Sequence, residues 1–312
     1  MDERWPPLPH EAWGETCTAL HLWCQVLGKY RLAHAPWVNH SWHATLYVTP
    51  RGLTTGAVPD PAGAIALTLD LHDHLLIAER AGGGRETMPL GPTSVAAFLA
   101  RTGEMVAALG GRFAIHGRPN EIPDAVPFAD DHAQRPYDAR AVERFHRALV
   151  SIEGVFQLFR TGFLGKVSPV HLFWGSFDLA VTRFSGRRAP AHPGGIPNLP
   201  DSVTREAYSH EVCSAGFWPG GNGMDAAFYA YAYPTPEGFA RAAVVPDGAT
   251  WNATLGEFVL PYEAVRGADD PHAALLAFLD STYVAAARIG GWDRTALECA
   301  RGVPRVPRAV PA

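Results

Sequence analysis

Apolar positions recur at helical spacing in four long segments of this chain. Each segment carries apolar side chains three and four positions apart, which is the period of a helix that covers a core with one face. Glycine pairs follow the second and fourth segments, and Asp138 can cap the start of the third. We therefore predict helices over residues 10–29, 92–109, 138–163 and 271–289.

Between these helices lie shorter stretches of alternating, β-branched or aromatic residues, which indicate strands. Polar turns join several of them directly, so hairpins dominate. This order favours an α+β fold with antiparallel sheets over a doubly wound parallel sheet. The predicted strands cover residues 42–49, 64–70, 75–80, 85–90, 112–116, 171–184, 226–233 and 251–260. Two segments rich in glycine and small residues, 185–203 and 205–223, are predicted to be loops.

The predicted elements divide the chain into two similar halves, each with the order helix, antiparallel strands, helix. Residues 1–118 form the N-terminal half and residues 138–300 the C-terminal half. The connector 119–137 holds four prolines and several acids, and the proline-rich tail 301–312 is predicted to be disordered. A length of 312 residues allows one large domain or two ordinary ones.

Lysine occurs only twice, at Lys29 and Lys166, and both times in the tripeptide Leu-Gly-Lys. The segments 36–49 and 169–182 follow, with proline, leucine and a Val-Thr pair at identical spacing. One interpretation is an internal duplication in which each tripeptide ends a helix, and the other is chance similarity. Because lysine supplies a compact ammonium that arginine does not replace, both lysines are candidate substrate-binding groups. Stabilisation of a helix C-terminus is the simpler alternative.

Composition narrows the class of protein. A hydrophobic fraction of 47% and a charged fraction of 18% are typical of a globular chain. The formal net charge of −5, without a basic cluster, argues against nucleic-acid binding. No apolar run reaches the ~20 residues of a membrane helix, and no secretory signal is evident. Four cysteines without Cys-x-x-Cys spacing indicate reduced thiols. We expect a cytoplasmic protein with no nucleic-acid or membrane partner; its oligomeric state is left open.

Histidines in aromatic surroundings are the main candidates for chemistry, because imidazole binds metals and titrates near neutral pH. His40 and His43 lie three positions apart, His171 begins a predicted strand, and His210 stands beside Glu211 in a predicted loop. We assign the four histidines as candidate ligands of a divalent metal ion, and His210 with Glu211 as the candidate catalytic pair. The alternatives are structural histidines and a surface loop whose glutamate caps a helix.

Aromatic residues near these groups are candidates for pocket walls. Trp42, Trp174 and Trp218 are assigned to substrate binding together with the two lysines. Three tyrosines at alternate positions from Tyr229 to Tyr233 share one face of a predicted strand. Such a stripe usually belongs to a core, but buried tyrosine hydroxyls need partners, so this face could also form the floor of an amphipathic pocket.

Two acidic residues, Asp178 and Glu257, lie in predicted strands. Strand alternation places Asp178 on the face of Thr182 and His171 on the opposite face, so only one of Asp178 and His171 can line a given pocket. We favour His171, since it lies near Lys166, and we expect Asp178 to be a buried acid paired with an arginine. Glu257 is a further candidate pocket acid.

Four motifs together resemble one family. They are the segment from His21 to Lys29, the pentapeptide from Asn39 to His43, the segment from Ser168 to Gly186, and the segment from His210 to Gly221. These motifs are similar to an uncharacterised bacterial family that is defined only as a domain of unknown function. The resemblance covers nearly the whole chain. It implies one complete cytosolic protein and no particular activity.

These candidates predict a small-molecule enzyme with a His/Glu-lined pocket between the two halves. In this hypothesis a divalent metal ion lowers the pKa of bound water, in a metal-assisted hydrolase or oxidoreductase. The alternative is a non-catalytic protein that binds a small anionic or aromatic ligand between aromatic walls. A third interpretation is a scaffold protein, which would expose a large apolar patch.

Overall fold

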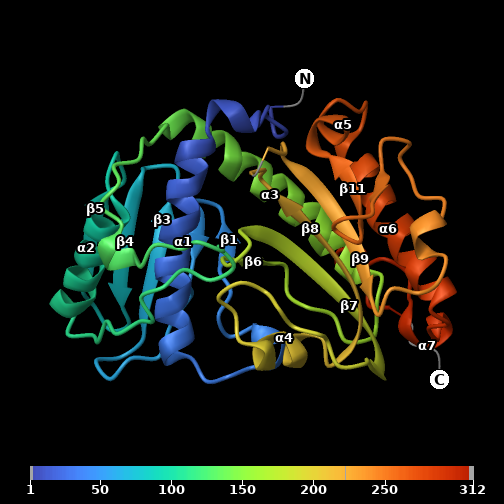
Figure 1. Cartoon of the computed structure of the whole chain (residues 1–312), viewed down its shortest axis with the longest axis horizontal. Coiled ribbons are helices and arrows are strands. Elements are labelled where there is room, and N and C mark those ends of the chain that lie inside the picture. The colour runs from blue at the N-terminus through green and yellow to red at the C-terminus, as the bar shows by residue number, and fades with distance from the viewer. Residues whose placement is uncertain (1–2, 222, 309–312) are drawn as a thin grey trace.

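The computed structural model describes residues 3–221 and 223–308, which form seven α-helices and two antiparallel sheets (Figure 1). The helices are α1 (Gly14–His34), α2 (Val95–Ala108), α3 (Ala139–Thr161), α4 (Asp201–Ala207), α5 (Tyr262–Arg266), α6 (Pro271–Ile289) and α7 (Arg294–Leu297). The strands are β1 (Tyr47–Thr49), β2 (Gly52–Thr54), β3 (Ile65–Asp70), β4 (Leu75–Arg80), β5 (Arg85–Pro89), β6 (His171–Phe173), β7 (Asp178–Arg188), β8 (His210–Trp218), β9 (Ala227–Tyr233), β10 (Thr250–Asn252) and β11 (Glu257–Pro261).

The first sheet is a meander in the N-terminal half. Its strands follow the order β1-β2-β3-β4-β5, each antiparallel to its neighbour. Apolar residues alternate along β3, where Ile65, Leu67 and Leu69 are fully buried. The helix α2 lies beside this sheet at the left edge of Figure 1. Its first turn is capped by Ser94, whose hydroxyl accepts a hydrogen bond from the Ala97 amide at 3.2 Å.

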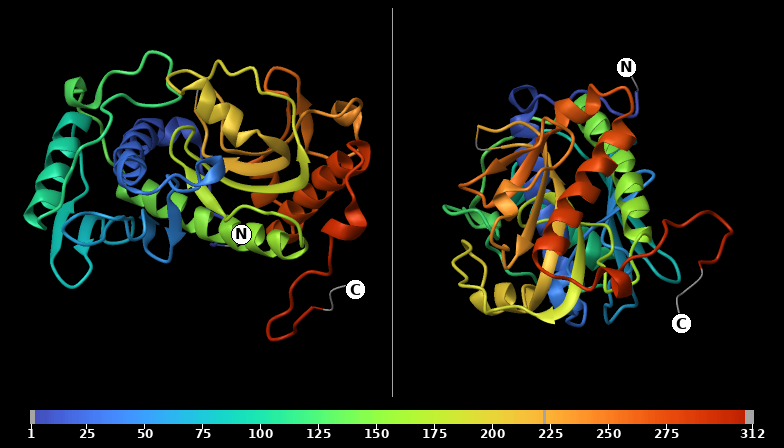
Figure 2. Two further views of the ribbon diagram at one scale, coloured as in Figure 1. Left: turned by 90° about the horizontal axis from the view of Figure 1, so that it is seen from below. Right: turned by 90° about the vertical axis from the view of Figure 1, so that its right-hand side faces the viewer.

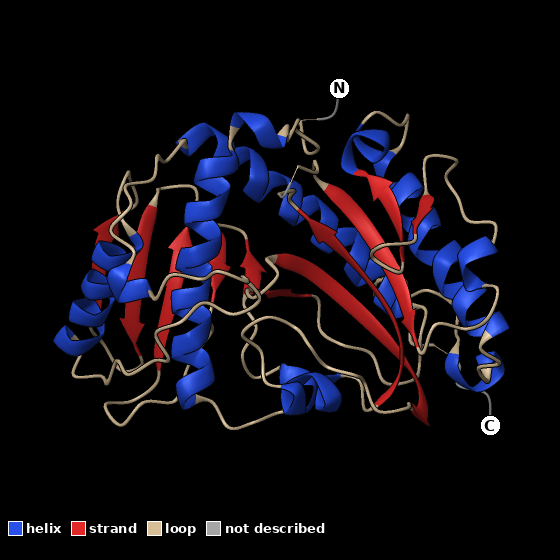
Figure 3. Ribbon diagram, in the orientation of Figure 1, coloured by secondary structure: helices blue, strands red, loops and turns tan. Residues whose placement is uncertain are grey.

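The second sheet has two faces with different surroundings. Its strands follow the order β10-β11-β9-β8-β7-β6. On one face, apolar side chains such as Leu179, Val181 and Phe217 are buried. The helices α3 and α6 pack against this sheet (Figure 1, Figure 3). Because side chains alternate along a strand, the residues between these positions point to the other face, which carries the cavity described below.

The buried apolar residues form one cluster that runs through both halves. Leu46, just before β1, and Leu172 in β6 exchange backbone hydrogen bonds of 3.0 and 2.8 Å, which join the N-terminal half to the second sheet. The helix α1 lies between the two sheets in the view of Figure 1 and is buried along most of its length. The halves therefore share one core. The connector between them also runs over this shared region.

The α+β class, the two antiparallel sheets and the long predicted helices are confirmed. The prediction that each Leu-Gly-Lys ends a helix is wrong for the first copy. There, α1 continues through Gly28 and Lys29 to His34, because both residues are buried in contacts that the sequence pattern does not reveal. In the second copy, α3 ends at Thr161, and Lys166 lies in the extended segment beyond it.

Three predictions about strands are corrected. Residues 205–223 are not a loop, because they contain β8, a strand inside the second sheet. One of the small residues that suggested a loop is required by packing: a Cβ at Gly216 would lie 2.3 Å from the Tyr229 hydroxyl. The predicted strand 171–184 is two strands, joined by a turn in which Phe177 has a φ of 61°. The predicted strand 112–116 does not form.

Residues 301–308 lead away from the body of the molecule after α7 (Figure 2). They are anchored at one end by the Gly302 amide, which donates to the Thr161 hydroxyl at 3.0 Å. The rest of the predicted disordered tail, 309–312, lies outside the described residues. Within the part of the chain that the structure describes, no helix combines the length and apolar character needed to cross a membrane.

Candidate functional site

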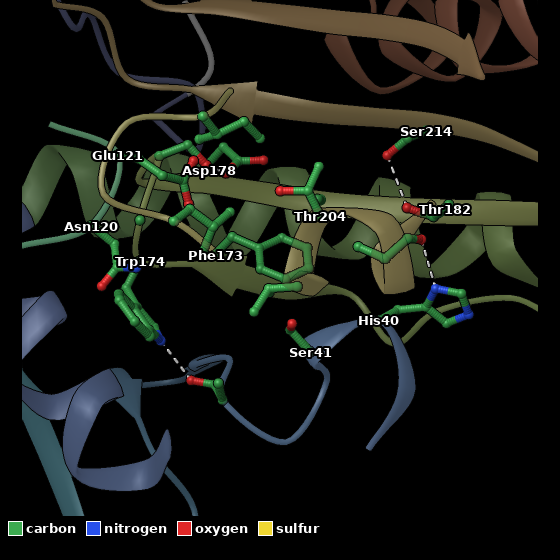
Figure 4. A pocket seen from close by; sticks show the side chains of 18 of the residues that line it. His40, Ser41, Asn120, Glu121, Phe173, Trp174, Asp178, Thr182, Thr204 and Ser214 are labelled. Carbon is green, nitrogen blue, oxygen red and sulfur yellow. Dashed lines mark hydrogen bonds between the residues drawn. The ribbon is translucent and has the colours of Figure 1, made fainter. Parts of the chain in front are cut away.

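A cavity of about 1200 Å³ opens on the free face of the second sheet and is lined by residues from both halves. Strands β7, β8, β9 and β11 supply its floor. The roof comes from α4, from the connector around Asn120 and from the loop 196–200. The helix α1 and the 3-10 turn η2 (Asn39–Ser41) complete the wall. Figure 4 shows part of this lining.

The residues that line the floor of the cavity are those that strand alternation places on one face of the sheet. Asp178, Ala180, Thr182 and Phe184 occupy every second position of β7 and all line the cavity. Neighbouring strands add Ser214, whose hydroxyl is 2.8 Å from that of Thr182 (Figure 4). The prediction that Asp178 and Thr182 share one face is therefore confirmed. The preference for His171 over Asp178 as the pocket residue is wrong. Their placement on opposite faces is also wrong, because the turn between β6 and β7 pairs His171 with Ala180, which shares the face of Asp178.

Asp178 is buried at one end of the cavity, and its partners are not arginines. The hydroxyls of Ser176 and Tyr229 both donate to its carboxylate. Burial raises the pKa of Asp178, and the two hydroxyls oppose that shift because they stabilise the charged form. Among the described residues no arginine forms an ion pair with Asp178, so the expected Asp–Arg pair is a wrong prediction.

Glu121 and Glu257 complete what we call the acidic end of the cavity, together with Asp178. Burial raises the pKa of Glu121 to about 7, and the negative charge of Asp178 adds to the shift. Burial and then Asp178 likewise raise the pKa of Glu257 to about 7. The two glutamates thus titrate near neutral pH under the influence of a third carboxyl group. The prediction of Glu257 as a pocket acid is confirmed by its position.

The backbone around Glu121 is held in place by the opposite roof loop. The Glu121 amide donates to the Pro197 carbonyl at 2.9 Å, and the Asn120 side chain donates to the Asn198 carbonyl at 2.9 Å. Glu121 has a φ of 63°, in the left-handed region that non-glycine residues rarely adopt. A Cβ at Gly175 would lie 1.9 Å from the Glu121 carboxyl, so a larger residue there would displace this side chain from its present position.

Lys29 reaches the cavity from α1 and is only 2% exposed. Its ammonium donates to the Asn120 side-chain oxygen and lies 5.3 Å from the centre of the Trp174 ring. Burial lowers the pKa of Lys29 to about 8. Gln25 fixes the Asn120 backbone by accepting from its amide at 2.8 Å and donating to its carbonyl at 3.0 Å. The Lys29 ammonium is therefore held by a hydrogen-bonded network that includes Asn120 and Gln25.

Lys166 lies near the other end, beside His40. The His40 Nδ1–H donates to the Ala207 carbonyl at 2.7 Å, so Nε2 is free to accept from the Lys166 ammonium at 2.5 Å. The same ammonium lies 4.8 Å from the Phe184 ring centre and 5.3 Å from that of Trp42. Lys166 itself is exposed and is not part of the cavity lining.

Two hydroxyls in the lining have unused hydrogen-bonding capacity. The Thr204 hydroxyl in α4 and the Ser41 hydroxyl in η2 are buried and have no partner among the described residues. Thr204 is 1% exposed. Ser41 and the preceding His40 both have a φ of 59°, two successive residues in the left-handed region. Both hydroxyls line the cavity (Figure 4) and are available to a ligand.

The four histidines assigned to a metal do not meet at one point. His40 and His210 approach each other, with ring centres 6.5 Å apart. His171 is fully buried, with both ring nitrogens unpartnered among the described residues. Only burial and nearby arginines act on it, and they lower its pKa to about 3. The His43 ring lies tilted against that of Trp37, with ring centres 4.5 Å apart, and accepts a hydrogen bond from the Val38 amide at 3.2 Å.

The assignment of His210 with Glu211 as a catalytic pair is not supported by their geometry. They are consecutive residues of β8 and therefore point to opposite faces of the sheet. Glu211 forms an ion pair with Arg187 at 2.7 Å and accepts from the Ser185 hydroxyl at 2.8 Å. The described residues contain no group of three or more His, Cys, Asp or Glu side chains that could hold a metal ion.

All three tryptophans assigned to substrate binding line the cavity. Trp174 is fixed by its indole N–H, which donates to the Ala44 carbonyl at 2.6 Å (Figure 4). Tyr229 and Tyr231 line the floor, as the pocket alternative for the tyrosine stripe predicted, and the Tyr231 hydroxyl lies 2.8 Å from that of Tyr208.

Sequence reasoning missed the roof residues Asn120, Glu121 and Thr204. The first two lie in the connector, where proline content alone indicated a linker. The pair Asn-Glu between Pro119 and Pro123 was the only available signal, since a polar pair in a rigid loop is compatible with a site. Thr204 lies in a short helix that the sequence pattern did not predict.

Comparison with known proteins gives one finding. Neither the curated proteins nor the solved structures contain a match to this chain. The family predicted from the motifs is confirmed by a match that spans nearly the whole chain. Residues 5–299 match the model of DUF5996, a family of unknown function, and the chain belongs to this family.

Proposed function

We propose that this protein is a small-molecule enzyme whose cavity performs acid–base chemistry, with hydrolysis as the reaction. The observation that carries the proposal is the acidic end. Two glutamates whose pKa is raised to about 7 line the cavity together with the buried Asp178, whose charge contributes to both shifts. Groups that titrate near the working pH are efficient in proton transfer, and enzymes produce them by burial and like charge.

The chemistry follows from the two protonation states. Near neutral pH, one of Glu121 and Glu257 can be ionised while the other is protonated. The ionised carboxylate takes a proton from a water molecule, whose oxygen forms a bond to the electrophilic atom of the substrate. The protonated carboxyl donates its proton to the leaving group as the old bond breaks. Asp178, held by Ser176 and Tyr229, keeps the pKa of both glutamates high.

This proposal changes the residues expected to act. The proposed catalytic groups are now Glu121 and Glu257 at the acidic end, in place of His210 and Glu211. The three tryptophans and Lys29 remain candidates for substrate binding at the walls of the cavity. The mostly apolar lining, which includes several aromatic rings, supports a small organic substrate, because such cavities bury most of a ligand and fix it by a few polar contacts.

The test uses a mixture of small metabolites in water enriched in ¹⁸O. We expect the purified protein to consume one or a few compounds, with one ¹⁸O atom appearing in a product by mass spectrometry. Asp178→Asn should slow this conversion by about 100-fold or more. Glu237→Gln, an exposed glutamate outside the cavity, is the matched control and should be unchanged. If the protein consumes a compound without placing ¹⁸O in any product, or consumes no compound, the proposal of a hydrolase is contradicted.

The second candidate is a non-catalytic binding protein for a small aromatic ligand. Four tryptophans line the cavity, at positions 37, 42, 174 and 218, and such walls bind flat apolar molecules without any chemistry. Native mass spectrometry separates the two proposals, because a binder retains a compound of the same mixture unchanged. An anionic ligand is disfavoured at the acidic end by like charge.

The internal duplication is also kept as a proposal. The shared order of helix, antiparallel sheet and helix in the two halves supports it, as does the identical spacing of proline, leucine and the Val-Thr pair within residues 36–49 and 169–182. We further propose a cytoplasmic location, on the basis of reduced thiols and charge.

A further inference from the structure

The acidic end holds three carboxyl groups and, within the described residues, no protein cation that pairs with them. Within the described residues, neither Glu121, Asp178 nor Glu257 forms a salt bridge, and the groups that shift their pKa include no lysine or arginine. Asp178 is stabilised only by two hydroxyls and a backbone amide. Buried carboxylates are normally paired with a cation. The three carboxyl groups of this pocket lack such a partner within the described residues.

The three carboxyl groups interact electrostatically but do not form a metal-binding cluster within the described residues. They are close enough for Asp178 to raise the pKa of both glutamates. They do not, however, belong to any group of side chains in residues 3–221 or 223–308 that could surround a metal ion. A charged organic group can contact carboxylates that are too far apart to ligate one ion.

Aromatic rings surround the same end of the cavity. Tyr229 and Tyr231 are stacked with ring centres 6.1 Å apart, and Tyr208 bonds to the hydroxyl of Tyr231. Trp218 and Phe173 also line the cavity. The faces of these rings carry partial negative charge and attract organic cations. Apolar surface beyond them can hold the uncharged part of a ligand.

Thr204 is an independent indication that a ligand belongs here. It is 1% exposed, lines the cavity and leaves its hydroxyl without a partner in the described part of the chain. A buried hydroxyl without a hydrogen bond is costly, and a threonine in a helix can normally bond the carbonyl four residues earlier. In Figure 4 this side chain lies between the β7 floor and the α4 roof.

From these observations we infer that the cavity binds an organic cation, namely a small molecule with an ammonium group attached to an aromatic or apolar body. The ammonium group lies at the acidic end and donates to Asp178 and Glu257. The body lies against the tyrosine and tryptophan rings. The inferred ligand occupies the same cavity as the substrate of the proposed enzyme. The inference rests on the proposed function only in the choice of this cavity.

The test compares three probes of similar shape and different charge: phenethylamine, 2-phenylethanol and 3-phenylpropanoate. Dissociation constants are measured by ligand-observed NMR on the purified full chain. We expect the amine to bind about tenfold or more tightly than the alcohol, and the carboxylate to bind most weakly.

Variants place the interaction at the acidic end. Glu257→Gln should weaken amine binding about fivefold or more and leave alcohol binding within about twofold. Glu257 makes no side-chain hydrogen bond within the described residues, so this variant keeps the fold intact even if Asp178→Asn does not. Glu237→Gln is the control, as an exposed glutamate away from the cavity, and should bind all three probes like the wild type.

Three results would overturn the inference: equal affinity for amine and alcohol, tightest binding of the carboxylate, or no binding of any probe at millimolar concentration. The inference and the proposed function fail separately. If the amine binds as expected but no ¹⁸O enters any product, the hydrolase is wrong and the cation site stands. If ¹⁸O enters a product of a neutral substrate and the probes show no charge preference, the cation site is wrong and the hydrolase is supported.

Discussion

Gly28 in α1 packs directly against the indole ring of Trp174, a residue of the other half of the chain. A Cβ at Gly28 would lie 2.1 Å from two atoms of that ring. The first Leu-Gly-Lys tripeptide thus provides both the space for Trp174 and the ammonium of Lys29 beside the same ring. This contact fixes one wall of the cavity and connects the two halves.

Replacing Gly28 by alanine should therefore destabilise the protein and displace Trp174. Overpacking of a tight contact costs about 1–3 kcal/mol, and the indole N–H would lose its bond to the Ala44 carbonyl. Urea denaturation measures the loss in the free energy of unfolding.

The matched control is Gly154→Ala, a glycine in the exposed part of α3 with open space around it. Alanine there should stabilise the helix by about 0.5–1 kcal/mol. If both variants gained stability, the close approach of Gly28 to Trp174 would be disproved.

Asp178→Asn should lower the pKa of Glu121 and Glu257. The negative charge of Asp178 raises both values, so its removal should move them from about 7 toward the ordinary 4.5, while burial, the larger cause, keeps them above it. Carbon-13 NMR titration of labelled glutamate carboxyls measures the change. Asp247→Asn, an exposed aspartate outside the cavity, should leave both values in place.

The buried neutral His171 should make the protein sensitive to acid. Its pKa is about 3 in the folded chain and 6.5 ordinarily, so the unfolded chain takes up the proton first as the pH falls. The stabilising contribution is complete above pH 6.5 and is lost from there toward pH 3, by about 1.4 kcal/mol per pH unit.

We therefore expect His171→Phe to retain about 2 kcal/mol more of its neutral-pH stability at pH 5 than the wild type retains. Some acid sensitivity will remain, because burial also lowers the pKa of His21 to about 4. Denaturation curves at both pH values measure this difference. His132→Gln, an exposed histidine, should follow the wild-type curve, and a parallel loss in His171→Phe would contradict the prediction.

Lys166→Met should raise the pKa of His40. Burial is the main reason that this pKa is low, and the positive charge of Lys166 lowers it further. Nitrogen-15 NMR of the imidazole ring measures the shift. Lys29→Met replaces the only other lysine of the chain, which does not contribute to the pKa of His40, and so serves as the control. An unchanged value in Lys166→Met would mean that the 2.5 Å contact does not persist in solution.

Some features of this protein were determined by the sequence alone, because they depend on neighbours along the chain. The periodicity of α3 and α6, the hairpin of β3 and β4, and the α+β class follow from local spacing. Strand alternation also predicts that Asp178 and Thr182 share one face, as they do in the cavity.

The tertiary structure alone decided which residues form the site. It placed Glu121, from a proline-rich connector, in the same cavity as Asp178 of β7, and it left His171 outside the lining although Ala180, its partner in the sheet, belongs to that lining. It also continued α1 through Gly28, where the sequence suggested a helix end. The physical reason is that side-chain roles depend on charge, burial and contact across the fold, and these are set by residues far away in the chain.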